Sequence, residues 1–208
     1  MRIVLSLLCV ALFTLQLTVC AAKDAGTGGA SFDAGVRMQF RAQAGSLDGF
    51  DATDHIAVPY EGWNGGVYHV QGQDGWLGET GFYSIDYRSP LMPGETKSWT
   101  FYIWALPGTA ASDMRLVGGF SNHDVPNLHI VLEYIQKPAG VTGGPAVGTT
   151  WTYPEIVNVL LPFYSTSDGL TGHGFRLTLT AVPEPSSILA LAGGIAGLGG
   201  LVLRRRKV

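Results

Sequence analysis

The stretch that decides the fold is GFRLTLTAV, residues 174–182. Its apolar side chains occupy every second position, at Phe175, Leu177 and Leu179, and arginine or threonine stands between them. Successive side chains of a β-strand point to opposite faces of the sheet. This alternation therefore predicts a strand with one face in the core and one face in water.

Three further segments also predict β-strands. VRMQFR (36–41) and LHIVLEYI (128–135) alternate in the same way, and SWTFYIWAL (98–106) is apolar on both faces, which predicts a central strand. Gly, Pro, Asn and Asp bound these segments, and no window of a dozen residues holds a helical period. We therefore expect about eight to ten strands in a single antiparallel β-sandwich of jelly-roll or immunoglobulin-like type.

Glycine-rich segments lie between the expected strands. Residues 22–31 (AKDAGTGGAS) are expected to be a flexible start, and residues 137–150 (KPAGVTGGPAVGTT) a long Gly/Pro loop. The Gly-rich residues 60–78 (YEGWNGGVYHVQGQDGWLG) are also expected to be looped.

The N-terminus has the layout of a secretory signal peptide at residues 1–22. Arg2 is followed by an apolar run over residues 3–19 and then by small residues. Cleavage is expected after Ala21 or Ala22, so the chain is exported.

Both cysteines, Cys9 and Cys20, fall inside this signal. A lipoprotein signal using Cys20 is the alternative, but Val19 stands where Gly, Ala or Ser is expected. The remaining domain, residues 23–182, has no cysteine. This excludes disulfides, thiolate catalysis and cysteine-ligated zinc in that domain.

Charge separates the domain from the tail. Residues 23–182 carry 15 Asp and Glu against 8 Lys and Arg, a difference of −7. A phosphate-binding surface needs clustered cations, so we expect no nucleic-acid partner.

The C-terminal segment 186–203 has 18 residues and no charge. A helix of this length reaches about 27 Å, close to the hydrocarbon thickness of about 30 Å. The basic residues that follow are Arg204, Arg205, Arg206 and Lys207. Positive charge favours the cytoplasmic side, so the sequence predicts one transmembrane helix with residues 23–182 outside the inner membrane.

Pro183, Glu184 and Pro185 stand immediately before this segment. The two prolines favour an extended backbone that a processing enzyme can read. The order of Pro-Glu-Pro, apolar helix and basic cluster over residues 183–208 closely resembles the PEP-CTERM sorting signal of Gram-negative bacteria. The resemblance implies recognition by an exosortase of the inner membrane. It also implies an association with exopolysaccharide and delivery to the cell surface or extracellular matrix.

Three carboxylates lie three residues apart in the segment SLDGFDATDH, at Asp48, Asp51 and Asp54. Hard oxygen ligands in an acidic loop predict a candidate Ca²⁺ site, the one cofactor that the sequence suggests. The alternative is that each Asp bonds the backbone of its own turn.

Catalytic motifs are absent from the sequence. There is no H-E-x-x-H and no G-x-S-x-G, although Ser121, His123 and Asp124 lie close together. We therefore expect a non-enzymatic domain. A His and a carboxylate within hydrogen-bond reach in a pocket would favour a secreted hydrolase instead.

Four aromatic residues belong to the glycine-rich segment: Tyr60, Trp63, Tyr68 and Trp76. Rings displayed beside polar groups predict a carbohydrate-binding surface, whereas buried rings would cap the end of the core. The whole sequence thus predicts an exported, biofilm-associated surface or matrix protein, anchored first in the inner membrane with its domain in the periplasm. The alternative is a permanently anchored periplasmic domain that binds carbohydrate or protein.

Overall fold

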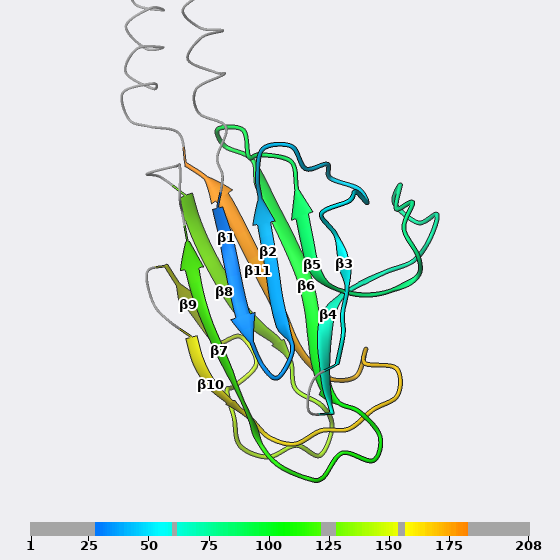
Figure 1. Cartoon of the computed structure of the whole chain (residues 1–208). Coiled ribbons are helices and arrows are strands. Elements are labelled where there is room, and N and C mark those ends of the chain that lie inside the picture. Colours follow the sequence, from blue (N-terminus) through cyan, green and yellow to red (C-terminus); the bar gives the residue numbers. More distant parts are fainter. Residues whose placement is uncertain (1–27, 60–61, 122–127, 154–156, 183–208) are drawn as a thin grey trace, which may run out of the picture.

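All regular structure in the described part of the chain is β-strand (Figure 1). The computed structural model describes residues 28–59, 62–121, 128–153 and 157–182. The strands are β1 (Gly28–Asp33), β2 (Arg37–Ala42), β3 (His55–Ile56), β4 (Trp63–His69), β5 (Gly81–Arg88), β6 (Thr96–Ala105), β7 (Met114–Ser121), β8 (Leu128–Gln136), β9 (Thr150–Thr152), β10 (Val157–Leu161) and β11 (His173–Ala181). The prediction of an all-β domain is confirmed.

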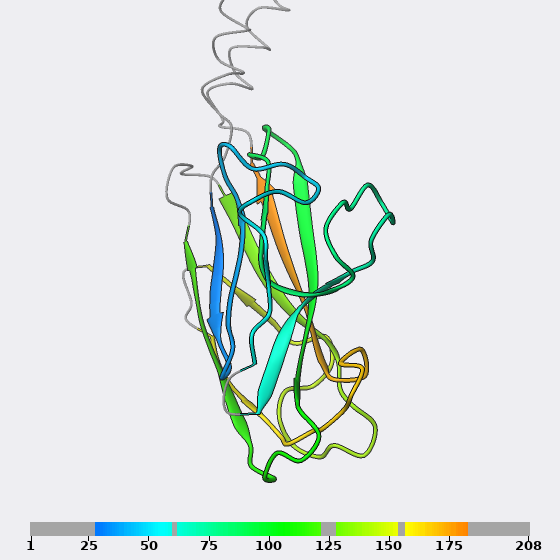
Figure 2. The ribbon, with the colours of Figure 1, turned by 45° about the vertical axis from the view of Figure 1, so that its right-hand side comes forward.

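The strands form one 11-stranded sheet in the order β10-β7-β1-β2-β5-β4-β6-β11-β8-β9, with β3 paired to β5. The sheet curls on itself until β9 and β10, the two ends of this order, lie on the same side of the molecule (Figures 1 and 2). The result is a nearly closed, barrel-like sheet around a single core.

The structure differs from the predicted antiparallel sandwich in two respects. The strands belong to one continuous sheet, and β2 runs parallel to β5. Both differences have the same origin, because β5 enters between β2 and β4. It pairs antiparallel with β4 along Val67–His69 and parallel with β2 along Gln39–Ala42. β5 thereby keeps the two halves of the sheet hydrogen-bonded to each other.

The alternating segment 174–182 becomes β11, which lies between β6 and β8. In this central position Phe175 is opposite Phe101 of β6 and Tyr134 of β8. The segment 98–106 becomes β6, between β4 and β11, which is the central strand expected from its two apolar faces.

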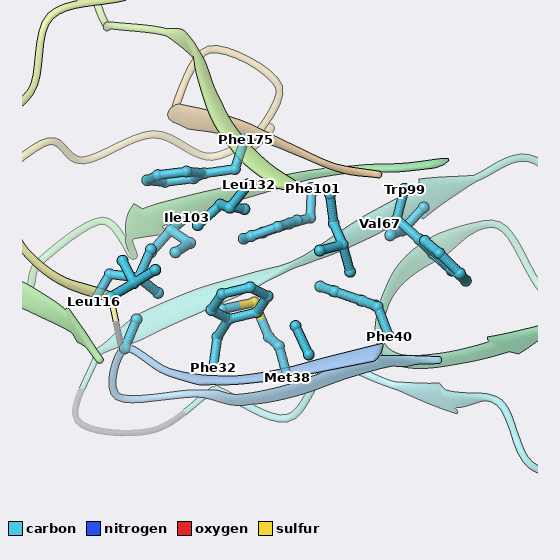
Figure 3. Packing of buried hydrophobic residues seen from close by; sticks show 14 of the residues in the cluster. Phe32, Met38, Phe40, Val67, Trp99, Phe101, Ile103, Leu116, Leu132 and Phe175 are labelled. Atoms are coloured by element: carbon cyan, nitrogen blue, oxygen red, sulfur yellow. The ribbon is translucent and has the colours of Figure 1, made fainter. Parts of the chain in front are cut away.

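Aromatic rings from five strands meet in the core. Phe101 packs against Phe40 at 4.9 Å, Phe32 at 5.2 Å and Phe175 at 5.3 Å between ring centroids, and Tyr134 continues the series. Figure 3 shows Phe32 and Phe40 on β1 and β2 pointing toward Phe101 and Phe175 on β6 and β11. Each such ring contributes about 1.5–3 kcal/mol by leaving water, so this series holds the two sides of the curled sheet together.

Two glycine-rich segments expected outside the strands lie within the sheet. Gly28–Asp33 forms β1 between β2 and β7, and Trp63–His69 forms β4 between β5 and β6. Here glycine permits close approach of neighbouring strands. A Cβ at Gly29 would collide with the carbonyl oxygen of Phe40, and one at Gly66 would lie 2.5 Å from that of Tyr83.

Candidate functional site

The last strand, β11, ends one residue before the last described residue of the chain. Ala181, the final residue of β11, is 2% exposed and is opposite Leu128 of β8. Its carbonyl accepts a hydrogen bond from the amide of Gly94 at 2.7 Å, and its amide donates one to the carbonyl of Glu95 at 3.0 Å. Val182 is 48% exposed and is the last described residue.

The predicted sorting elements lie outside the described residues. These are Pro183, Glu184 and Pro185, the apolar segment 186–203 and the basic residues Arg204, Arg205, Arg206 and Lys207, together with the signal segment 1–22 at the other terminus. Among the residues that the structure describes, none forms a helix long and apolar enough to cross a membrane.

A buried lysine organises the loops beside this exit. Lys97 lies at the start of β6 with its side chain 5% exposed. Its Nζ donates to Asp48 Oδ1 and to Ser89 Oγ at 2.6 Å, and it lies 3.4 Å from Glu95 Oε1. Partial desolvation raises the pKa of Asp48, but the hydrogen bonds from Lys97 and Ser89 outweigh it and leave that pKa below its usual range.

The other two carboxylates of the acidic loop cap backbone amides. Asp51 accepts bonds from the amides of Leu47 at 2.8 Å and Thr53 at 2.7 Å. Asp54 accepts one from Asp51 at 2.8 Å and one from Tyr87 of β5 at 3.0 Å. Burial raises the pKa of Asp54 to about 6 despite these bonds.

The three candidate Ca²⁺ ligands therefore have different bonding partners. Asp48 binds Lys97, Asp51 closes its own turn, and Asp54 fastens the loop to β5. Within the described ranges, no three His, Cys, Asp or Glu side chains are grouped so that they could hold a metal ion. Asp51 and Asp54 thus accept bonds from backbone amides of their own turn, whereas Asp48 is bound by Lys97 and Ser89 from other segments.

The candidate carbohydrate-binding aromatics have different environments. Trp63 and Trp76 are 3% and 4% exposed, whereas Tyr68 is 36% exposed and packs against Phe82 at 4.9 Å. Tyr60 lies outside the described residues. Of the three described rings, Tyr68 is thus the one with an accessible surface.

Trp76 belongs to an aromatic cluster that the sequence does not reveal. Its indole stacks on the imidazole of His69 at 3.6 Å between centroids, and its neighbours include Tyr83 at 4.8 Å and Phe50 at 5.4 Å. These contacts fasten the loop 70–80 and the loop 43–54 to the ends of β4 and β5. The burial of Trp76 is therefore explained by packing.

A His–carboxylate pair, which the hydrolase alternative requires, occurs within this cluster. His69 Nε2 lies 2.9 Å from Asp86 Oδ2, and Asp86 also contacts Arg88. One face of the imidazole is covered by Trp76. In the described part of the chain, no serine hydroxyl is hydrogen-bonded to this ring. The imidazole of His69 and the carboxylate of Asp86 are thus within hydrogen-bond reach of each other inside the aromatic cluster.

A second histidine lies in the core. His173 is fully buried, with Nε2 at 2.7 Å from the carbonyl of Pro162 and Nδ1 at 2.8 Å from the Tyr134 hydroxyl. A carbonyl only accepts, so Nε2 carries the proton and Nδ1 accepts from Tyr134. Burial lowers the pKa of His173 and raises that of Tyr134 to about 12.

The residues proposed for a hydrolase are described only in part. Ser121 ends β7, and His123 and Asp124 lie outside the described residues.

The fold defines the class of protein, an all-β domain. Its central strand β11 ends two residues before Pro183 in the sequence. The family model of the PEP-CTERM protein-sorting motif matches residues 181–207. The chain therefore carries a PEP-CTERM protein-sorting motif at residues 181–207. This motif implies export, processing by an exosortase and sorting toward the cell surface. Neither the curated proteins nor the solved structures yielded a match.

Proposed function

We propose that this chain is a non-enzymatic cargo protein that an exosortase releases from the inner membrane to the cell surface or extracellular matrix. In this proposal Pro183–Pro185 is the recognition element and the segment 186–203 is a transient anchor. The basic residues 204–207 hold that anchor with its end in the cytoplasm. The all-β domain stays in the periplasm until it is processed.

One observation carries the proposal. The sorting motif begins at residue 181, which is also the last residue of β11. Ala181 is paired with Leu128 of β8 on one side of the strand and is hydrogen-bonded to Gly94 and Glu95 on the other. The last strand of the described sheet is thus followed at once by the matched motif, as expected when the domain is the cargo.

A role of the domain in an exopolysaccharide matrix is the narrower part of the proposal. The domain is acidic, with a difference of −7 between its basic and acidic residues over 23–182, and this favours a hydrated, soluble surface. Tyr68 supplies an exposed ring on which a sugar face could stack. The His69–Asp86 pair is accounted for by the aromatic cluster, and we therefore assign it no turnover.

The intact mass and C-terminal peptide of the protein recovered from its native host test this function. We expect the mature chain to lack residues beyond the Pro-Glu-Pro region and to be found at the surface or in the matrix. Replacement of Pro183, Glu184 and Pro185 by alanine should leave a precursor that keeps its tail, whereas Glu79→Ala in the exposed loop should be processed normally.

A wild-type chain that still ends in Arg-Arg-Arg-Lys-Val would contradict release by an exosortase. The domain would then act at the inner membrane as a permanently anchored protein.

A further inference from the structure

Three exposed apolar side chains surround the point where the chain leaves the domain. Leu47 is 61% exposed, Met92 is 49% exposed and Val182 is 48% exposed. We call these three residues the exit rim. They belong to the loop after β2, the loop between β5 and β6, and the end of β11, which lie at one end of the sheet in Figure 1.

Hydrogen bonds join the segments that carry the rim. The Gly94 amide joins the Met92 loop to Ala181, next to Val182. Asp48, next to Leu47, accepts from the amide of Ser89 at 3.2 Å and so joins the Leu47 loop to the end of β5. The loop of Leu47 is therefore joined to the loop of Met92, and the loop of Met92 to the end of β11.

The carboxylates beside the rim are paired with a lysine, although the Asp48 side chain is 62% exposed. Lys97 Nζ engages both nearby carboxylates, those of Asp48 and Glu95. Glu95 also accepts from the amide of Met92 at 2.8 Å. Neither carboxylate projects past the rim as an unpaired anion.

The short length of chain beyond the rim limits how far the rim can lie from a membrane that holds the segment 186–203. Four residue steps separate Val182 from Ser186, where the uncharged segment 186–203 begins. Even a fully extended chain covers about 14 Å in four steps. The headgroup layer on each side of a bilayer is about 5–8 Å thick. With the segment inserted, even a fully extended tether holds the rim within about 6–9 Å of the outer surface of the headgroup layer, and any shorter tether brings the rim into that layer.

From this geometry we propose that the exit rim is a membrane-contact surface, and that Leu47, Met92 and Val182 rest in the lipid headgroup region before processing. This inference depends on the proposed function, because it requires residues 186–203 to be in the membrane. It adds that the domain has a defined orientation, with the loop 137–149 facing away. β8, which precedes that loop, ends opposite the start of β11, at the other end of the sheet.

The test uses the full chain with Cys9→Ser and Cys20→Ser, which leaves no other thiol. Leu47→Cys and Met92→Cys report on the rim. Val147→Cys, 58% exposed in the loop 137–149, is the matched control at the far end. Each cysteine carries an environment-sensitive fluorophore, and the chain is reconstituted into vesicles of phosphatidylethanolamine with a minority of phosphatidylglycerol and spin-labelled lipid.

We expect spin-labelled lipid to quench the two rim probes about twofold or more relative to the Val147 probe, because only the rim reaches the headgroup depth. A label at Leu191→Cys reports insertion of the anchor independently. If Leu191 is quenched and the rim probes match Val147, the membrane-contact inference is wrong and the proposed anchor stands. If Leu191 is not quenched, both are wrong. Protection of the rim probes only after an exosortase is added would assign the rim to the enzyme and overturn contact with lipid.

Discussion

The amide of Gly94 and the carbonyl of Ala181 are joined by a hydrogen bond of 2.7 Å, two residues before Pro183. The same residue, Ala181, is the last of β11 and the first of the matched sorting motif. Folded domain and sorting signal therefore share a residue. An enzyme that recognises Pro-Glu-Pro must therefore bind its substrate directly beside the end of β11, a central strand of the folded sheet.

This overlap predicts where the processed chain ends. We expect the mature C-terminus at or beyond Val182, because upstream peptide bonds belong to a strand paired on both edges. Gly94→Pro removes the donor to Ala181 and cannot adopt the φ of +83° found at Gly94. It should lower the hydrogen-exchange protection of the end of β11.

Gly94→Ala is the matched control for this variant, because it carries the strain of positive φ but keeps the amide donor. Hydrogen exchange followed by mass spectrometry measures the difference between the two variants. Equal protection in both would mean that the Gly94 bond does not secure the exit. A mature terminus upstream of Ala181 would contradict the placement of the processing site.

Tyr134→Phe should destabilise the domain by about 1–3 kcal/mol, because it leaves His173 Nδ1 buried without a donor. Denaturant unfolding of the full chain measures this change. Tyr164→Phe is the control, since the Tyr164 hydroxyl bonds Thr171 at an exposed site and its loss should change stability by less than about 0.5 kcal/mol. Similar effects of the two substitutions would show that the Tyr134–His173 bond contributes little.

His173 also predicts a dependence of stability on pH. Burial lowers its folded pKa below the ordinary 6.5, so the unfolded chain takes up the proton first as pH falls. The contribution of this histidine is therefore complete above pH 6.5 and is lost on acidification below it. The unfolding free energy of His173→Gln, measured across this range, should fall less on acidification than that of the unaltered chain. A parallel decline would contradict the assignment.

For Asp54 we expect the free energy of unfolding to depend on pH in the opposite direction, over a lower pH range. Its folded pKa of about 6 lies above the ordinary 3.8, so the folded state holds the proton more tightly. Stability contributed by the protonated carboxyl is present below pH 3.8 and is lost as pH rises to about 6. Asp54→Asn, which does not titrate, should remove this slope from unfolding curves recorded over that interval. An unchanged slope would mean that Asp54 is ionised throughout.

Local patterns in the sequence predicted the strands whose positions alternate. Phe175, Leu177 and Leu179 lie in the core of β11 with the alternation read from the sequence. The glycine-rich strands β1 and β4 were not predicted. Gly29 and Gly66 are required there because neighbouring strands approach closely, and the pattern of their own segments does not reveal this. The parallel β2–β5 pair has the same kind of origin, since it depends on where β5 inserts.

The candidate sites show the same limit. Asp48, Asp51 and Asp54 look like one ligand set in the sequence, yet their partners, Lys97 and Tyr87 among them, come from other strands. The His69–Asp86 contact joins residues 17 apart, and no local pattern marks it. The sorting motif was recognisable because its three features follow one another in fixed order without a contribution from the fold.

Two aromatic substitutions separate a polysaccharide-binding role from a packing role. Trp76→Ala should lower stability by about 3 kcal/mol, because a buried indole stacked on His69 is lost and a cavity remains. Tyr68→Ala removes an exposed ring, and should weaken binding to the host's purified exopolysaccharide about threefold or more with little change in stability. Binding of the full chain is measured by co-sedimentation and stability by thermal unfolding. Tyr153→Ala, at another tyrosine that is 40% exposed, controls for the loss of any surface ring. If Tyr68→Ala binds as tightly as Tyr153→Ala, Tyr68 is not part of a polysaccharide site, and matrix association must depend on another surface of the domain.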